Sequence, residues 1–211
     1  MSLKVCTIIN NPVPSNCHVL YDADVKSCLL IDPGSSNGTI IDDELSGLGL
    51  IPEGIILTHE HFDHVWSCRY FVEKYNIPII CSRECSESII DMKKNHSVFY
   101  DNTNAFVCPK ASYILDDNHW KMKWHDKVLD FHFAGGHTAS GVFVMVENLL
   151  FTGDTLLKDL KTVTKLRCGS KVQLSESIEY LKSLQGQAYR VYAGHGSDFL
   201  LDDYDLSIAL G

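Results

Sequence analysis

A cluster of metal-binding side chains follows a short apolar run in the segment "ILTHEHFDH", residues 56–64. It places His59, His61, Asp63 and His64 within six consecutive positions. Imidazole and carboxylate groups are ligands for zinc, and also for iron or manganese. We therefore interpret the cluster as a metal site. A histidine-rich surface loop is the alternative.

The spacing of the cluster excludes one common zinc motif. In HExxH the second histidine lies four residues after the first, and this chain has Asp63 at that position. An apolar strand runs into the cluster, so we expect the side chains to project from a loop at the end of the strand. Ligands close together in such a loop can reach more than one metal. Glu60 is expected to point away from them.

Three downstream segments supply further candidate ligands. They are "AGGHTASG" with His137, "LLFTGDTL" with Asp154 and "VYAGHGSD" with His195. Each polar residue follows an apolar run or lies in a glycine-rich turn. Any one of them alone is more often structural than functional. Together with the cluster they supply enough ligands for two metals.

The whole set, in this order, resembles the metallo-β-lactamase-fold hydrolase superfamily. "THEHFDH", "GGHT", "FTGDTL" and "GHG" match its motifs, from about Asn16 to about Ser197. The resemblance implies an α+β fold, a four-layer αββα sandwich with the metal site at the edge of two packed sheets. It also implies three groups of ligands: His59, His61 and His137 for a first metal, Asp63, His64 and His195 for a second, and Asp154 as a bridge. The histidines at 18, 96, 119, 125 and 132 match no motif and are predicted not to be ligands.

The implied chemistry is hydrolysis at two divalent metal ions, with zinc expected first and iron or manganese as alternatives. A shared water becomes a metal-bridging hydroxide near neutral pH, and it would attack a thioester, ester or lactone carbonyl. Asp63 is the predicted catalytic residue, which orients the nucleophile or moves its proton. The alternatives are a mononuclear iron persulfide dioxygenase on the same scaffold, a phosphodiesterase, and a metal-binding relative that is not an enzyme.

Departures from the family pattern concern the substrate and not the ligands. The common "GHTPGS" is "GHTASG" here, and "PGHG" is "AGHG". Glyoxalase II proper adds a C-terminal helical domain, for which the residues after His195 leave no room. We therefore expect one domain over residues 1–211, a compact glyoxalase-II-like hydrolase.

A basic segment follows Asp154. Five of the chain's 18 lysines and arginines lie in "LLKDLKTVTKLRCGSK". We hypothesise that Lys165 and Arg167 bind a carboxylate or phosphate group of a small-molecule substrate. A solvated basic surface is the alternative.

The composition limits partners and location. The chain has 211 residues, a net charge of −9 and eight cysteines without a CxxC pair. The acidic charge argues against a nucleic-acid partner, and no apolar run is long enough for a membrane span. No signal peptide is evident. We predict a cytoplasmic protein in which most cysteines are small buried hydrophobic residues.

The elements that position the ligands follow from apolar periodicity and turn residues. Strands are expected at 3–9, 17–21, 27–31, 54–59, 77–82, 105–108, 112–115, 128–133 and 190–193. A hairpin over 142–154 should turn at Glu147 and Asn148. Helices are expected at 37–48, 64–75, 86–94 and 173–186, the last with Ser175 as N-cap and Gly186 just past its end.

Overall fold

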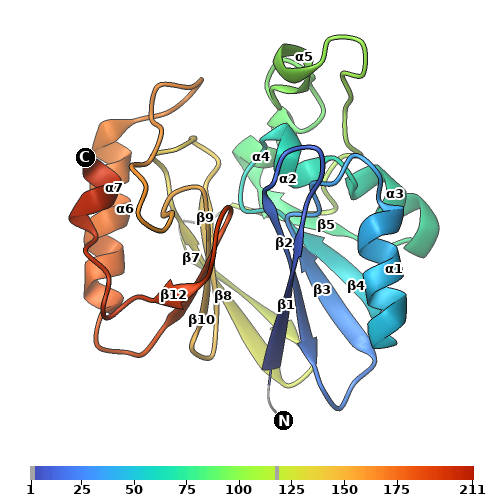
Figure 1. Ribbon diagram of the computed structural model, residues 1–211, viewed down its shortest axis with the longest axis horizontal. Coiled ribbons are helices and arrows are strands. Elements are labelled where there is room, and N and C mark those ends of the chain that lie inside the picture. The colour runs from blue at the N-terminus through green and yellow to red at the C-terminus, as the bar shows by residue number, and fades with distance from the viewer. Residues whose placement is uncertain (1–2, 117–118) are drawn as a thin grey trace. The chain divides into compact units, whose positions relative to one another are not determined.

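The computed structural model describes residues 3–116 and 119–211 of the chain. The chain divides into two compact units, one ending at Ile114 and the other beginning at Leu115. Each unit contains a six-stranded sheet and the helices that pack on it (Figure 1). That residues 1–211 form a single domain stays a prediction, and residues 1–2 and 117–118 of that range lie outside the described part. In the part that is described, no helix is long and apolar enough to cross a membrane.

The sheet of the first unit has its strands in sequence order. They are β1 Leu3–Ile9, β2 Asn16–Asp22, β3 Ser27–Ile31, β4 Ile51–Ile56, β5 Ile79–Ser82 and β6 Tyr113–Leu115. The first three pair antiparallel, while β3, β4 and β5 pair parallel. Parallel strands bring their carboxyl ends to the same edge of a sheet. The residues that follow β3 and β4 therefore leave the sheet side by side, and Asp32 N donates to Ile56 O at 3.1 Å.

Five helices belong to this unit: α1 Thr39–Leu48, α2 Phe62–Val65, α3 Cys68–Tyr75, α4 Arg83–Ser88 and α5 Ser97–Tyr100. Apolar side chains of α1 and α3, among them Ile41, Leu45 and Phe71, are fully buried against strand residues such as Leu30 and Ile55. Burial of this apolar surface is the main force that holds the sheet and helices together.

The sheet of the second unit has the order β12-β11-β10-β9-β8-β7. Its strands are β7 His119–Trp124, β8 Lys127–Phe133, β9 Val142–Val146, β10 Leu149–Gly153, β11 Arg190–Ala193 and β12 Phe199–Leu200. Among the described strands of this sheet, β10 and β11 pair parallel and the other neighbours pair antiparallel. The parallel pair again sends two chain segments out at one edge, where Gly194 N donates to Gly153 O at 2.8 Å.

Two helices, α6 Lys171–Leu184 and α7 Ser207–Leu210, complete the second unit. Leu174, Ile178 and Leu181 recur at helical spacing on α6 and are buried in a core with Phe143 and Val191. Ser170 caps α6 by accepting from Gln173 N at 3.3 Å. The prediction of Ser175 as N-cap is wrong, because Ser175 lies within α6 and its hydroxyl donates to Lys171 O one turn earlier.

Most predicted elements are confirmed, with four further corrections. The helix expected over 64–75 is two helices separated at residues 66–67, and that expected over 86–94 is α4, which ends at Ser88. No strand forms at 105–108, where Cys108 N instead donates to Ile89 O. The strand expected over 54–59 begins three residues earlier and ends at Ile56, so Thr58 and His59 belong to the following loop.

Candidate metal centre

The histidine cluster lies in the loop that leaves β4, as its sequence predicts. The loop is extended at His61 and then enters the single turn of α2, which is closed by His64 N donating to His61 O at 2.9 Å. The three rings lie together. The centroid of His59 is 4.8 Å from that of His61 and 4.3 Å from that of His64. All three histidines are buried.

Asp32 orients two of these histidines, and it was not among the residues predicted from the sequence. It directly follows β3 in a left-handed backbone conformation with φ of 57°, which turns the chain sharply. Its Oδ1 accepts from Thr58 N at 2.8 Å, and its Oδ2 accepts from Thr58 Oγ1 at 2.6 Å. Oδ2 also lies 3.2 Å from His64 Nδ1. Oxygen and nitrogen atoms of Asp32, His59 and His64 lie within 4.8 Å of one another.

These contacts decide which nitrogen of each ring can bind a metal. An ionised carboxylate only accepts hydrogen bonds, so the proton of His64 is on Nδ1. The single hydroxyl proton of Thr58 is donated to Asp32, so Thr58 Oγ1 accepts from His59 Nδ1 at 3.0 Å. In both rings Nε2 therefore carries the lone pair. This is the support that metal-binding histidines usually receive from a carboxylate behind them.

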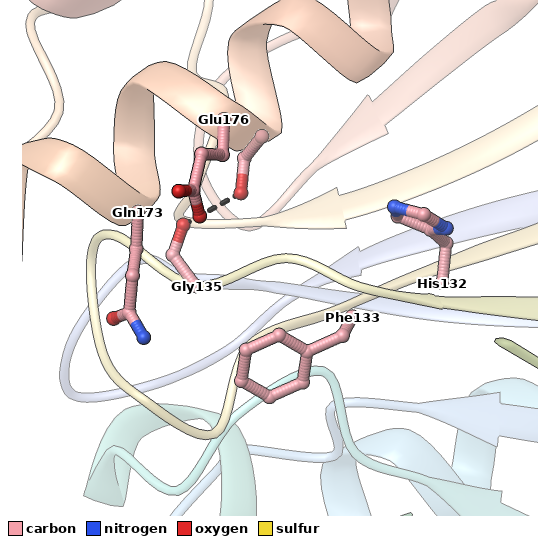
Figure 2. Close-up of a pocket in the computed structure, with 6 residues that line it drawn as sticks. His132, Phe133, Gly135, Gln173 and Glu176 are labelled. Carbon is pink, nitrogen blue, oxygen red and sulfur yellow. Dashed lines mark hydrogen bonds between the residues drawn. The ribbon is translucent and has the colours of Figure 1, made fainter. Parts of the chain in front are cut away.

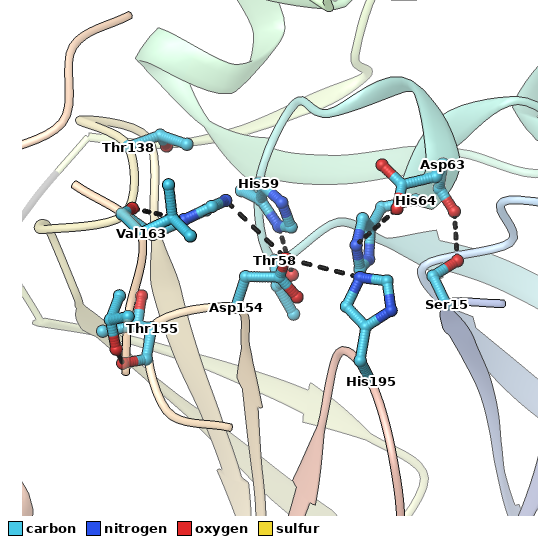
Figure 3. A network of polar contacts seen from close by, with 12 residues as sticks. Ser15, Thr58, His59, Asp63, His64, Thr138, Asp154, Thr155, Val163 and His195 are labelled. Atoms are coloured by element: carbon cyan, nitrogen blue, oxygen red, sulfur yellow. Dashed lines mark hydrogen bonds and ion pairs between the residues drawn. The ribbon is translucent and has the colours of Figure 1, made fainter. Parts of the chain in front are cut away.

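Asp63 is held at the start of α2 with its carboxylate toward His64. Its Oδ2 lies 3.6 Å from His64 Nε2, and its backbone carbonyl accepts a hydrogen bond from the Ser15 hydroxyl (Figure 3). Gly34 packs against the same carbonyl so closely that a Cβ at Gly34 would lie 1.5 Å from the oxygen. The turn after Asp32 thus admits only glycine at this position.

The second unit contributes a carboxylate between two histidines. Asp154 directly follows β10, and its Oδ2 lies 3.7 Å from His137 Nε2 and 3.4 Å from His195 Nε2. Figure 3 shows the Asp154 and His195 side chains directed toward each other. His137 Nδ1 donates to the backbone carbonyl of Val163 at 2.8 Å. Its Nε2 therefore also carries the lone pair, on the side of Asp154.

The turn that carries His137 is clamped by the first turns of α6. Ser177 Oγ donates to Gly135 O at 2.6 Å, and a Cβ at Gly136 would lie 2.6 Å from the Cα of Leu174. Gly136 also has a φ of 140°, which other residues rarely adopt. A cavity of about 310 Å³ adjoins this clamp, lined by His132, Phe133, Gly135, Gln173, Glu176 and Ser177 (Figure 2).

The basic segment is joined to the same turn at two points. Val163 O accepts from His137, and Ser170 N donates to Gly136 O at 2.9 Å. Lys165 and Arg167 lie between these two anchors with exposed side chains. Their predicted role in binding an anionic substrate stays a prediction.

Most other histidines and cysteines have structural contacts. Among the five predicted non-ligands, His132 stacks on Tyr180 with ring centroids 3.5 Å apart, and His96 stacks on His61 at 4.6 Å. Six of the eight cysteines are buried, which confirms the prediction for most of them. Burial raises the pKa of the Cys17 and Cys68 thiols well above the usual value, and that of Cys28 to about 12, so these thiols stay protonated.

Comparison with known proteins identifies the family. The family model described as the metallo-beta-lactamase superfamily matches residues 10–196. The chain belongs to this superfamily. A "Probable metallo-hydrolase MJ0888" of Methanocaldococcus jannaschii is 31% identical over 179 residues, covering 81% of this chain and 84% of that protein. A "Probable metallo-hydrolase YqgX" of Bacillus subtilis is 28% identical over 190 residues, covering 89% and 87%.

Solved structures of the superfamily confirm the predicted α+β, metallo-β-lactamase-like sandwich fold. The structure titled "BLEG-1 B3 metallo-beta-lactamase" aligns with a TM-score of 0.86 at 25% identity, over 94% of each chain. Another, titled "TTHA1623 in a di-iron-bound form", aligns with a TM-score of 0.77 at 23% identity, over 93% of this chain and 94% of that one. A relative named "Hydroxyacylglutathione hydrolase", from Aeromonas salmonicida, is 24% identical over 90% of this chain and 65% of its own length.

The side chains fit the metal chemistry of the superfamily. Each unit presents imidazole Nε2 atoms beside a carboxylate, and three of the imidazoles are oriented by an acceptor behind Nδ1. Nitrogen and oxygen donors of this kind suit zinc, iron and manganese.

Proposed function

We propose that this member of the metallo-β-lactamase superfamily is a hydrolase with two divalent metal ions. His59, His61 and His137 would hold the first ion, and Asp63, His64 and His195 the second. Asp154 would bridge them. The observation that carries the proposal is the place of Asp154 Oδ2, within 3.7 Å of one histidine of each proposed set. A carboxylate in that place suits the bridge between paired metal ions.

Each group of residues in the site would have a distinct role in hydrolysis. Two divalent ions at these ligands would supply a hydroxide near neutral pH and polarise the carbonyl of the substrate. Asp63 would hold the proton of the attacking group on its carboxylate and fix the direction of attack, because it lies beside His64 and is anchored through its own backbone. The three oriented histidines would keep their donor atoms fixed, so that little reorganisation accompanies the reaction.

The proposed substrate is a small thioester, ester or lactone. The relative named hydroxyacylglutathione hydrolase supports a thioester, since its match extends over 90% of this chain. Lys165 and Arg167 would bind an anionic group of the substrate, because their loop is anchored on the His137 turn. Zinc is the metal we propose first. A cytoplasmic location is part of the proposal, because the free cysteines suit a reducing compartment.

Metal analysis of protein purified without added metal, combined with thioester hydrolysis, tests the proposal. We expect two ions per chain, and loss of at least about 100-fold in kcat with fewer bound ions in Asp63→Ala. Asp91→Ala is a suitable control, since Asp91 is a half-buried aspartate of the turn after α4 that accepts from Lys93 N. One iron per chain, with oxygen consumption on glutathione persulfide and no hydrolysis, would instead show a persulfide dioxygenase and contradict the proposal.

A further inference from the structure

A row of aromatic rings begins at the histidine cluster and ends in solvent. The ring of His96 stacks on His61 with centroids 4.6 Å apart and planes 29° apart. The ring of Phe99 meets His96 edge-on at 6.0 Å. Phe99 is 75% exposed and is the most exposed large apolar residue in the described part of the chain. His96 thus links a predicted metal ligand directly to an exposed aromatic side chain.

A second line of rings starts inside the same cluster. Phe62 lies between His61 and Asp63 in the sequence, and its ring stacks on Tyr100 at 4.6 Å with planes 25° apart. Tyr100 is 47% exposed and meets Trp66 edge-on at 6.1 Å. Both lines converge on the single turn of α5. We call Phe62, His96, Phe99 and Tyr100 the aromatic shelf.

The shelf also borders a hollow of suitable size for part of a small molecule. A cavity of about 540 Å³ is lined by Pro12, Ser36, Trp66, Tyr100, Asp101, Asn104 and Ala105. Small-molecule sites commonly have volumes of about 300–1,000 Å³ and combine aromatic walls with a few polar groups. Tyr100 belongs both to the shelf and to the wall of this cavity.

The exposure of several apolar rings to water beside the ligand loop indicates that they bind an apolar group. Surface apolar residues are common when scattered singly, but here they form a set that is in ring contact with a catalytic loop. Successive ring contacts lead from His61 through His96 to Phe99, so a substrate group that extends from the ligand loop along this line would pack on these rings. Flat apolar groups pack on such rings in stacked or edge-on geometry. The shelf therefore fits a flat apolar group of a substrate that is held at the ligand loop.

We propose that the aromatic shelf binds an aromatic or bulky apolar acyl group of the substrate. The proposal rests on the hydrolase function proposed above and specifies its substrate class: esters and thioesters of aryl-substituted or bulky apolar acids. Phe99 and Tyr100 are specificity-determining residues, and the ring of His96 fixes the shelf against the ligand loop.

Two thioesters that differ only in one ring test the proposal. The propanoyl and 3-phenylpropanoyl thioesters of N-acetylcysteamine are compared by kcat/KM. The wild-type protein should have the higher kcat/KM for the phenyl substrate. The ratio of the two kcat/KM values, phenyl over propanoyl, should fall about tenfold in the double variant Phe99→Ala/Tyr100→Ala. Its kcat/KM for the propanoyl substrate, which has no ring, should fall much less than that for the phenyl substrate, and Tyr113→Ala should leave the preference at the wild-type value. Tyr113→Ala, which truncates a 56%-exposed tyrosine on β6, is the matched control.

The outcomes separate the shelf from the hydrolase function. An equal preference in wild type and double variant overturns the shelf while hydrolysis stands. If the wild-type protein hydrolyses neither thioester, ester nor lactone, the hydrolase function fails, and the shelf is then tested by calorimetric binding of 3-phenylpropanoate. Weaker binding by the double variant supports the shelf, and equal or absent binding overturns it. If the double variant keeps the substrate preference but no longer binds phosphatidylcholine vesicles, the shelf is a membrane contact instead. If it keeps the preference but no longer self-associates, the shelf is a contact with a second copy of the chain.

Discussion

Replacing Asp32 by asparagine should weaken metal binding without unfolding the protein. The carboxylate accepts three hydrogen bonds, at 2.8 Å and 2.6 Å from Thr58 and at 3.2 Å from His64. Asparagine retains one acceptor oxygen, which can still pair with Thr58 N. Its NH₂ group would replace the oxygen that faces Thr58 Oγ1 and His64 Nδ1. Two accepting contacts would become donating ones.

The consequence for the histidines follows from the proton positions. His64 Nδ1 would have to accept from the amide, so the ring proton would move to Nε2 and block the metal-binding lone pair. Thr58 Oγ1 would turn its own proton toward His59 and push that ring toward the same unfavourable tautomer. Loss of such support typically costs 10- to 100-fold in metal affinity, or about 1.4–2.8 kcal/mol.

Competition titration with a chelator, using Zn²⁺ and Co²⁺, measures this effect. The apparent dissociation constant should rise about 10- to 100-fold in Asp32→Asn. The free energy of unfolding of the metal-free protein should fall by only about 1–3 kcal/mol in urea, because the polar groups can form new pairs. Asp22→Asn is the matched control, a buried aspartate in the same sheet that accepts from Asp24 N at 3.0 Å. Wild-type metal affinity in Asp32→Asn would refute the assignment of the ring protons.

Three further expectations can be tested together. Gly34→Ala should lower turnover at least about 100-fold, because the added Cβ displaces the Asp63 carbonyl of the ligand loop. The control Gly47→Ala has open space around it in α1 and should raise the free energy of unfolding in urea by about 0.5–1 kcal/mol. Lys165→Ala and Arg167→Ala should each raise KM for an anionic substrate about two- to fivefold and leave KM for a neutral analogue unchanged. An equal rise in KM for the anionic and the neutral substrate would contradict a charge contact. Burial opposes the lowered pKa of Asp42, but hydrogen bonds from Lys74 and two tyrosines outweigh it. This carboxylate therefore stabilises the fold above pH of about 3.8 and loses that contribution as the pH falls further, so the difference in urea stability between wild type and Asp42→Asn should shrink at pH 3.

The sequence predicted the candidate ligands because their chemistry is concentrated in short motifs after apolar strands. Asp32 follows β3 in the same way as Asp154 follows β10, and this strand-end position was the signal that could have revealed it. It was missed because a lone aspartate before Pro33-Gly34 looks like ordinary turn chemistry. Its partner Thr58 lies in the loop after the next parallel strand, 26 residues away, and sequence spacing does not show such pairing.

The errors in the elements have a related cause. The apolar residues at 105–108 suggest a strand, yet Phe106 stacks on Trp66 just after α2, and the buried Cys108 donates from its backbone to Ile89 just after α4. β7 was not predicted, because "HWKMKW" alternates exposed polar residues with residues that are mostly only half-buried, and this resembles a polar segment. Tertiary packing decided these segments, and local propensity did not.

Two of the three supports behind the histidines respond differently to mutation over evolutionary time. His64 depends on the side chain of residue 32, so almost any change there removes its acceptor. His137 depends on a main-chain carbonyl, which every amino acid provides, and the Val163 side chain itself is 50% exposed. The side chain of residue 163 can therefore change without loss of this acceptor, and new substrate preferences can arise there while the histidine it supports stays in place.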